Sequence, residues 1–136
     1  MNFKNLQTAI FVLFFITLGF SQARTDFTAY GVTLSVANKN GSWSDFAAVK
    51  KTEVPVTIDF EKNRIIVYSE LEQVYRIAEY FPEKENKTEY INFFSCLSNE
   101  GTFTEITLIT SKTANFSKMF IKDKSRVLLY ELKKLE

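Results

Sequence analysis

The chain has 136 residues, with 17 basic and 16 acidic side chains, no histidine and one cysteine. This balance of charge excludes a nucleic-acid partner held by phosphate contacts, which needs a clear excess of Lys and Arg. Without histidine the chain lacks the commonest metal ligand and the side chain best suited to proton transfer near neutral pH. One cysteine cannot form an internal disulfide or a cysteine-rich zinc site. We therefore expect no metal, no cofactor and no catalytic residues, and interpret the protein as not an enzyme.

Residues 1–23 have the three parts of a secretory signal peptide. Lys4 supplies the positive charge, residues 9–20 are an apolar run, and Ser21-Gln22-Ala23 precedes a cleavage site after Gln22 or Ala23. The run is shorter than the roughly 20 apolar residues that a spanning helix requires. We predict a helical, cleaved signal peptide and an exported protein, periplasmic or secreted, that has no membrane contact after cleavage. Because Lys4 is the only charged residue in this segment, the remaining chain is neutral.

Residues 24–136 are predicted to form a single β-rich domain, since no linker or low-complexity segment interrupts them. Apolar residues occupy every second position in residues 30–36 and again in residues 54–60, as expected of half-buried strands. Residues 64–68 are rich in β-branched side chains and follow a turn at residues 61–63. We predict a hairpin over residues 54–69.

Two further hairpins are predicted in the second half of the chain. One pairs residues 90–97 with residues 103–109, and Gly101 in the intervening turn can adopt the positive φ that such turns require. The other pairs residues 118–122 with residues 126–132.

Two segments are ambiguous. Residues 70–81 place Leu71, Val74 and Ala78 at helical spacing, but a strand that turns Tyr75 to one face is also consistent, and we favour the strand because hairpins surround it. Residues 42–51 fit either a short capped helix or an irregular strand leading into residue 54. Together the elements predict a mainly β fold of seven to nine short strands, arranged as a compact antiparallel β-sandwich or a small up-and-down barrel.

The order of these features is similar to that of small secreted proteins of the Bacteroidota, particularly flavobacterial ones, most of which have no assigned activity. The resemblance covers most of the chain after residue 23 and rests on strand and turn spacing and on these segments: Phe20-Ser21-Gln22, Trp43, Val56-Thr57-Ile58-Asp59, Arg64-Ile65-Ile66-Val67-Tyr68-Ser69, Gln73-Val74-Tyr75-Arg76-Ile77, and Cys96 shortly before Gly101. Such proteins often carry a second cysteine just beyond that glycine, whereas this chain reads Gly101-Thr102-Phe103-Thr104. The resemblance implies an exported β-rich domain and supplies no active-site residues.

Carboxylates and the cysteine are the candidates for chemistry. A glycosidase needs two carboxyl groups held at a defined separation across a cleft, and the acidic residues of turns and strand faces are normally solvated. Cys96 has the apolar neighbours Phe94 and Leu97, so we expect a buried structural thiol rather than a reactive one. The carboxylate pairs available for acid and base catalysis are Glu70/Glu72, Glu83/Glu85 and Glu100/Glu105.

The aromatic side chains permit two interpretations, because they could line a ligand cavity or simply fill a small core. They are Trp43, Phe46, Tyr75, Tyr80, Phe81, Phe93, Phe94 and Phe103. The leading functional interpretation is an exported, non-enzymatic binding or interaction module with an apolar ligand pocket, whose partner is a small apolar ligand or another protein. The alternatives are a structural or surface interaction protein without a ligand, and a hydrolase that uses paired carboxylates.

Overall fold

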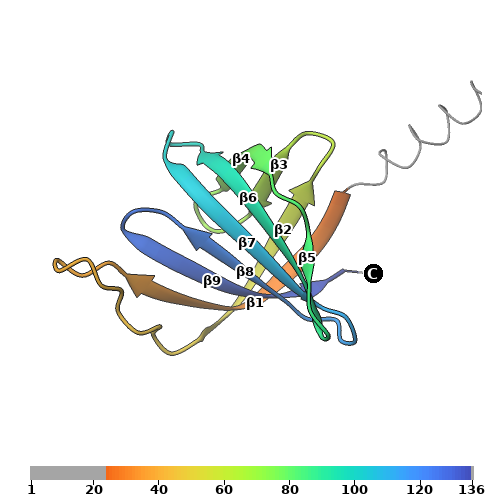
Figure 1. Cartoon of the computed structure of the whole chain (residues 1–136), viewed down its shortest axis with the longest axis horizontal. Helices are drawn as coiled ribbons and strands as arrows, with labels where there is room; N and C mark the ends of the chain where they lie inside the picture. Colours follow the sequence, from red (N-terminus) through yellow and green to blue (C-terminus); the bar gives the residue numbers. More distant parts are fainter. Residues whose placement is uncertain (1–23, 136) are drawn as a thin grey trace, which may run out of the picture.

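The computed structural model describes residues 24–135, so the signal peptide predicted at residues 1–23 lies outside the described part of the chain. Within residues 24–135 no helix is long and apolar enough to cross a membrane. These residues form nine strands (Figure 1): β1 (Arg24–Val36), β2 (Lys50–Asp59), β3 (Arg64–Val67), β4 (Gln73–Tyr80), β5 (Lys84–Glu85), β6 (Glu89–Ser98), β7 (Phe103–Ser111), β8 (Ser117–Lys122) and β9 (Arg126–Lys134).

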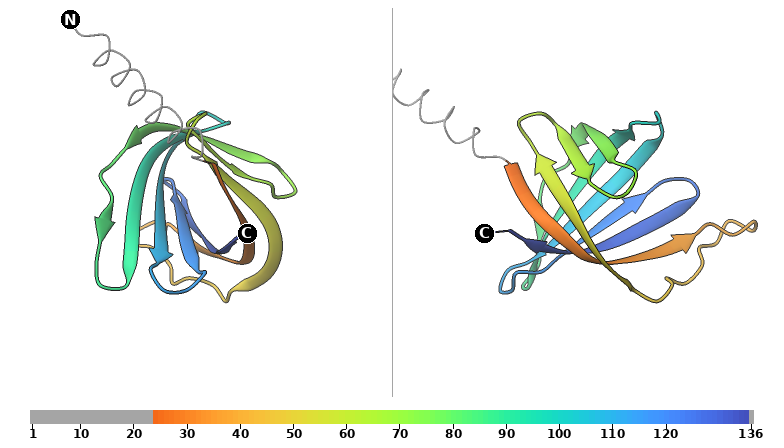
Figure 2. Two further views of the ribbon diagram at one scale, coloured as in Figure 1. Left: turned by 90° about the vertical axis from the view of Figure 1, so that its right-hand side faces the viewer. Right: turned by 180° about the vertical axis from the view of Figure 1, so that it is seen from behind.

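Eight of these strands form a closed antiparallel barrel. Around the barrel the order is β1, β2, β3, β4, β6, β7, β8, β9, and β9 then pairs with β1. The short β5 pairs only with the first part of β6, while the remainder of β6 pairs with β4. The strands therefore surround a common interior (Figure 2). The predicted up-and-down barrel is confirmed, and the sandwich alternative does not apply.

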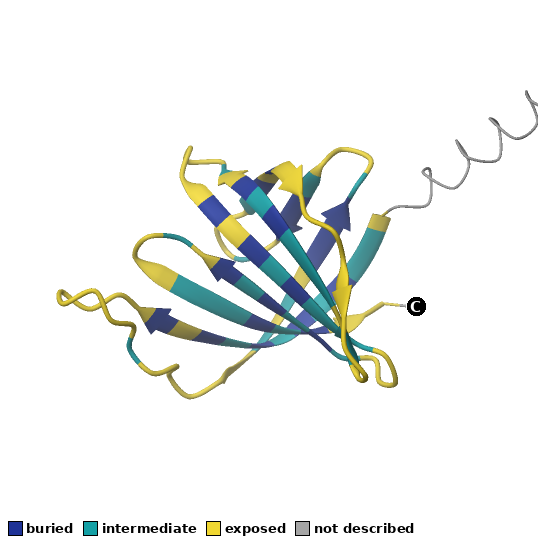
Figure 3. Ribbon diagram, viewed as in Figure 1, coloured by how far each residue is buried: buried dark blue, intermediate teal, exposed yellow. Residues whose placement is uncertain are grey.

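Alternate residues of the barrel strands point into this interior, and buried bands consequently alternate with less buried ones along the strands (Figure 3). The fully buried side chains include Ile58 of β2, Ile65 of β3, Ile106 of β7, Met119 of β8 and Leu132 of β9. Burial of an aliphatic side chain of this size contributes roughly 1.5–3 kcal/mol. Since every barrel strand contributes to this core, packing of the interior holds the barrel closed.

A bulge in β1 changes which of its residues face inward. The register shifts between Ala29 and Gly31 in the pairing of β1 with both of its neighbours. Ala29 is fully buried before the bulge, and Val32 packs against the core after it. A Cβ at Gly31 would lie 2.9 Å from both the Glu131 carboxylate and the Val49 side chain, so glycine permits a close approach here.

A second bulge, in β4, likewise changes which residues face inward. The register between β4 and β6 shifts between Ile77 and Glu79, so that Tyr80 pairs with Phe94. The rings of these two residues are 5.7 Å apart between centroids. Tyr80 thereby joins the inward-facing residues, although simple alternation from Tyr75 would place it outside.

The structure resolves the two ambiguous segments. Residues 73–80 are a strand, so the preferred interpretation of residues 70–81 is confirmed. Residues 42–49 form no helix and run irregularly beside β1, with the Ser44 amide donating to the Val36 carbonyl and the Ala47 amide donating to the Leu34 carbonyl. The hairpins predicted over residues 54–69, 90–109 and 118–132 are all present. Gly101 has a φ of 79°, as its turn requires.

The two ends of the barrel carry different connections. At one end lie the start of β1 and the last described residue, Leu135, whose amide donates to the Asp26 carbonyl. The connections 60–63, 81–88 and 112–116 lie at the same end. We call this the terminal end. At the other, which we call the loop end, lie the connections 37–49, 68–72, 99–102 and 123–125.

Candidate functional site

The interior of the barrel is packed in its middle and hollow at both ends. Side chains such as Ile65, Ile106 and Met119 are fully buried in the middle. The hollow at the terminal end and the hollow at the loop end have no lining residue in common. The core therefore separates two independent candidate sites, and we refer to them as the apolar hollow and the polar hollow.

The apolar hollow, at the terminal end, has a volume of about 800 Å³. It lies in the size range of small-molecule pockets, roughly 300–1,000 Å³. Side chains from six of the eight barrel strands and from the connections at this end line the hollow. The aromatic lining residues are Phe27, Phe60, Tyr80, Phe81, Phe94 and Phe116.

Three of these rings form a cluster on one wall of the apolar hollow. The Phe60 centroid lies 6.1 Å from those of both Tyr80 and Phe94. The Tyr80 hydroxyl donates to Asn63 Oδ1 at 2.6 Å, outside the hollow's lining. Burial raises the Tyr80 pKa, and Cys96 and Asp59 add to the effect. Because the polar group of Tyr80 is already bonded elsewhere, its ring contributes apolar surface to the hollow.

Polar side chains hold the rim of the apolar hollow in place. Asn115 makes two hydrogen bonds to the backbone of Lys134: its amide nitrogen donates to the Lys134 carbonyl at 3.0 Å, and its oxygen accepts from the Lys134 amide at 2.9 Å. Asn92 donates to Glu83 at 3.1 Å. The connection 112–116 is thus fixed to the end of β9, which keeps the hollow preformed.

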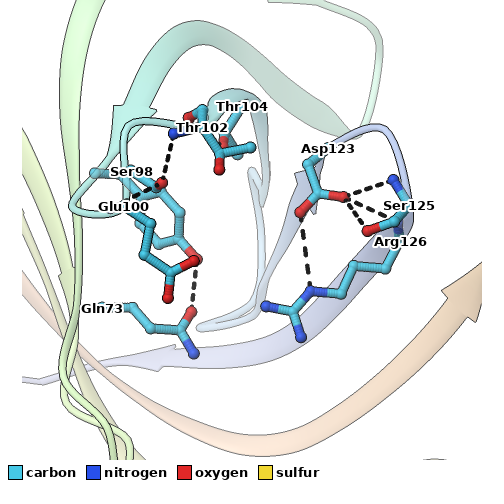
Figure 4. Close-up of polar contacts among 9 residues, drawn as sticks. Gln73, Ser98, Glu100, Thr102, Thr104, Asp123, Ser125 and Arg126 are labelled. Carbon is cyan, nitrogen blue, oxygen red and sulfur yellow. Dashed lines mark hydrogen bonds and ion pairs between the residues drawn. The ribbon is translucent and has the colours of Figure 1, made fainter.

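The polar hollow, at the loop end, has a volume of about 400 Å³. Figure 4 shows its polar side chains around the opening. Asp123 Oδ1 accepts hydrogen bonds from the Ser125 amide at 2.8 Å, the Ser125 hydroxyl at 2.9 Å and the Arg126 amide at 3.0 Å. Its other oxygen lies 3.9 Å from Arg126 Nε. Asp123 therefore closes the turn between β8 and β9 and orients the guanidinium.

Tyr75 lies at the floor of the polar hollow, 5% exposed. Its hydroxyl donates to Gln73 Oε1. Burial raises the Tyr75 pKa to about 12; Tyr130, Asp123 and Glu100 reinforce the shift, and Arg126 opposes it. The Tyr75 hydroxyl at the floor of the hollow therefore stays protonated and neutral near pH 7.

The carboxylates considered from the sequence lie in different surroundings. Glu85 forms an ion pair with Lys112 at 2.8 Å, whereas Glu83 lines the apolar hollow. Glu72 and Glu100 both line the polar hollow, a combination that their distance in the sequence did not indicate. Within residues 24–135 no group of three His, Cys, Asp or Glu side chains is placed to hold a metal ion.

Cys96 lies in the packed middle of the barrel, with no exposed surface. Burial raises its pKa to about 12, so the thiol stays protonated near neutral pH. The side chain is free rather than bridged. Its position agrees with the expected structural role.

The aromatic residues selected from the sequence separate into different environments. Tyr80, Phe81 and Phe94 line the apolar hollow, and Tyr75 lines the polar one. The others do not line either end: Phe46 packs on Phe120 with ring centroids 6.3 Å apart, Trp43 lies under Lys122, Phe93 lies under Lys84, and Phe103 is 57% exposed.

Sequence reasoning missed several lining residues. Phe60 could have been assigned from the alternation of residues 54–60, which places it inward with Val56 and Ile58. Phe27 and Arg126 could not have been assigned to a hollow from the sequence, because no turn or spacing indicates which strands meet at each end of the barrel.

The chain matches no protein-family model, no curated protein and no solved structure. The resemblance to small secreted proteins of the Bacteroidota thus stays a prediction.

Proposed function

We propose that this protein is an exported, non-enzymatic binding protein that holds a small apolar ligand in the apolar hollow at the terminal end. The observation that carries the proposal is the set of aromatic side chains around an open hollow of about 800 Å³. Apolar pockets of this size with a few placed polar groups are the usual sites for small ligands. Eight-stranded barrels leave room for one such ligand when their interior is not completely filled.

The polar groups of the rim support a ligand that is apolar along most of its surface. Asn115 and Asn92 are already bonded to neighbouring residues, so they contribute to the shape of the rim more than to recognition of a ligand. Transfer of apolar surface from water into the hollow stabilises a complex by about 25 cal/mol per Å² before the costs of association. A planar aromatic molecule or a short acyl chain fits this chemistry.

The test is titration of the protein, expressed from residues 1–136, with N-phenyl-1-naphthylamine, a neutral apolar fluorophore. We expect saturable binding at one site, with increased fluorescence. Phe81→Ala and Phe116→Ala remove aromatic surface from the hollow and should each weaken binding three- to tenfold, which corresponds to a loss of about 0.7–1.4 kcal/mol of apolar contact. Ala114→Trp, at an exposed lining position, should block the hollow.

Phe103→Ala is the matched control, because Phe103 is an exposed aromatic residue at the loop end and lines neither hollow. It should leave the dissociation constant unchanged. Binding that is insensitive to Phe81→Ala, Phe116→Ala and Ala114→Trp, or the absence of saturable binding, would overturn the proposal.

The hydrolase alternative has less support, because the pair Glu100/Glu105 considered from the sequence does not line one hollow. Glu100 lines the polar hollow, whereas Glu105 lines a groove outside that hollow. The surface-interaction alternative has one feature in its favour: Trp43, Phe46 and Val49 in the connection 37–49 are 38%, 45% and 51% exposed. Exposed apolar groups of this kind can meet a protein partner. A Phe46→Ser variant that keeps full binding of the fluorophore would separate this surface from the apolar hollow.

A further inference from the structure

The polar hollow at the loop end contains charges that the fold does not use. Arg126 contacts Asp123 only through Nε, at 3.9 Å, and its two terminal amino groups donate no hydrogen bond to any residue within 24–135. The Glu100 carboxylate likewise has no hydrogen-bond or ion-pair partner in this part of the chain, where only its backbone amide is bonded, to Ser98. Both side chains line the same hollow.

Arg126 and Glu100 form no ion pair with each other, although they have opposite charge and face one hollow (Figure 4). Both act on the hydroxyl of Tyr75 at the floor, Glu100 raising its pKa and Arg126 lowering it. Glu100 and Arg126 lie on opposite sides of the opening (Figure 4), and Tyr75 lines the same hollow. A guanidinium with free terminal amino groups is the group that best binds a carboxylate through two parallel hydrogen bonds.

The remaining walls of the polar hollow are apolar or carry more acidic groups. Leu71, Ile121 and Leu128 supply aliphatic surface, and Glu72 supplies a second carboxylate. Since Asp123 is committed to its turn, the groups that are free to bind are one cation and two anions. The hollow therefore favours a ligand that presents a carboxylate to Arg126, an ammonium group to the glutamates and a short aliphatic part to the wall.

We propose that the polar hollow is a second binding site, for a free amino acid with a short aliphatic side chain. Arg126 holds the carboxylate, Glu100 accepts from the ammonium group, and Leu128 with its aliphatic neighbours contacts the side chain. A hollow of about 400 Å³ accommodates a molecule of this size. The two sites share no lining residue, so this proposal stands or fails independently of the apolar ligand.

The test is calorimetric titration of the protein, expressed from residues 1–136, with three related probes. They are L-leucine, N-acetyl-L-leucine, which lacks the ammonium group, and L-leucine amide, which lacks the carboxylate. We expect L-leucine to bind at one site. Loss of one charge-assisted contact should weaken binding about tenfold, so both derivatives should bind at least that much more weakly. L-glutamate should also bind more weakly than L-leucine, because the free groups of the hollow are mostly acidic.

Two variants test which residue binds the carboxylate of the ligand and which binds its ammonium group. Arg126→Gln should weaken binding of L-leucine about tenfold and leave the remaining affinity for L-leucine amide unchanged. Glu100→Gln should weaken binding of L-leucine and L-leucine amide but leave that of N-acetyl-L-leucine unchanged. Arg126 and Glu100 are both exposed, so these substitutions should not prevent folding.

Lys124→Gln and Glu105→Gln are matched controls, because each removes the same type of charge from an exposed position that does not line the polar hollow. Both should bind L-leucine as the unmodified protein does. Phe116→Ala, in the apolar hollow, should have no effect either. Failure of L-leucine to bind at millimolar concentration, or equal losses for all three probes in both variants, would overturn the proposal.

Discussion

The two ends of the barrel are built from the same strands and the same inward face, yet they present opposite chemistry. The change occurs within single strands: β6 places Phe94 at the apolar hollow and Ser98 at the polar one, and β4 places Tyr80 and Gln73 in the same way. Successive side chains of each strand point alternately into and out of the barrel, but this two-residue period does not require the inward side chains to be all apolar or all polar. The residues that face inward at one end of the barrel can therefore differ in chemistry from those at the other end.

What keeps the ends distinct is the packed middle. Met119, Ile106 and Cys96 have at most 1% of their surface exposed. A close-packed interior excludes water and leaves no passage for a ligand between the two ends. The difference between the ends is therefore a property of the rims and can be altered at either end without disturbing the other.

The largest expected effect comes from opening the wall between the hollows. Met119→Ala removes a fully buried side chain from the middle and should lower the free energy of unfolding by about 2–5 kcal/mol. Urea unfolding followed by circular dichroism measures this loss. Leu71→Ala, at a side chain that is 82% exposed, should change the stability by less than about 0.5 kcal/mol. Similar values for the two variants would contradict a packed middle.

The next effect tests the turn that shapes the loop end. Asp123→Ala leaves two backbone amides and a serine hydroxyl without their acceptor and should cost about 1–2 kcal/mol at pH 7. The neighbouring Lys124→Ala should cost little. A small loss for Asp123→Ala would show that the turn does not depend on this carboxylate.

Asp123 should also make stability depend on pH. Burial raises its pKa, but the hydrogen bonds from Ser125 and Arg126 and the charge of Arg126 outweigh burial, so its pKa lies below the usual value of 3.8. A carboxyl with a lowered pKa contributes stability above its unfolded value, and this contribution is lost as pH falls through the folded value. Urea unfolding between pH 6 and pH 2.5 should therefore give a smaller pH dependence for Asp123→Asn than for the unmodified protein. An unchanged profile would contradict this role.

A smaller effect compares one tyrosine at each end. Tyr75→Phe removes a hydroxyl that donates to Gln73 from a side chain only 5% exposed, and should cost about 0.5–1.5 kcal/mol. Tyr80→Phe removes a hydroxyl bonded to Asn63 at a side chain 44% exposed, where water replaces the lost partner, and should cost less. Equilibrium unfolding of both variants measures the difference. Equal losses would mean that the two hydroxyls are equally solvated.

The smallest expected effect is the reactivity of Cys96 in the middle of the barrel. Because burial raises its pKa to about 12, the folded protein should react slowly or not at all with 5,5′-dithiobis(2-nitrobenzoate) at pH 8. In urea the same reagent should titrate one thiol per chain, since the sequence contains one cysteine. Ser125→Cys, at an exposed position, provides the rapidly reacting control. Rapid reaction of native Cys96 would show that the middle opens.

Local pattern was sufficient to predict most strands and turns. Alternation assigned the inward face of residues 54–60, and Gly101 marked a turn whose positive φ the structure contains. Segments with mixed signals were harder: residues 70–81 include helix-favouring residues, and pairing with β3 and β6 makes them a strand. Tertiary pairing overrode the local propensity there.

The candidate sites were less predictable than the strands. Phe94 and Tyr80 were named among the aromatic candidates, but only the β4 bulge turns Tyr80 inward beside Phe94. Arg126 had no local feature to single it out. It acquires its position because β9 begins at the same end as Glu100 and Tyr75.

By itself the sequence determined the strand periods and the turns, because these depend on residues close together in the chain. Closure of the barrel depends on the pairing of β1 with β9, and the loop end depends on Arg126 meeting residues of β4 and β6. Contacts of this range follow from how all the strands pack together, so only the tertiary structure decided that the inward face divides into an aromatic hollow and a charged one.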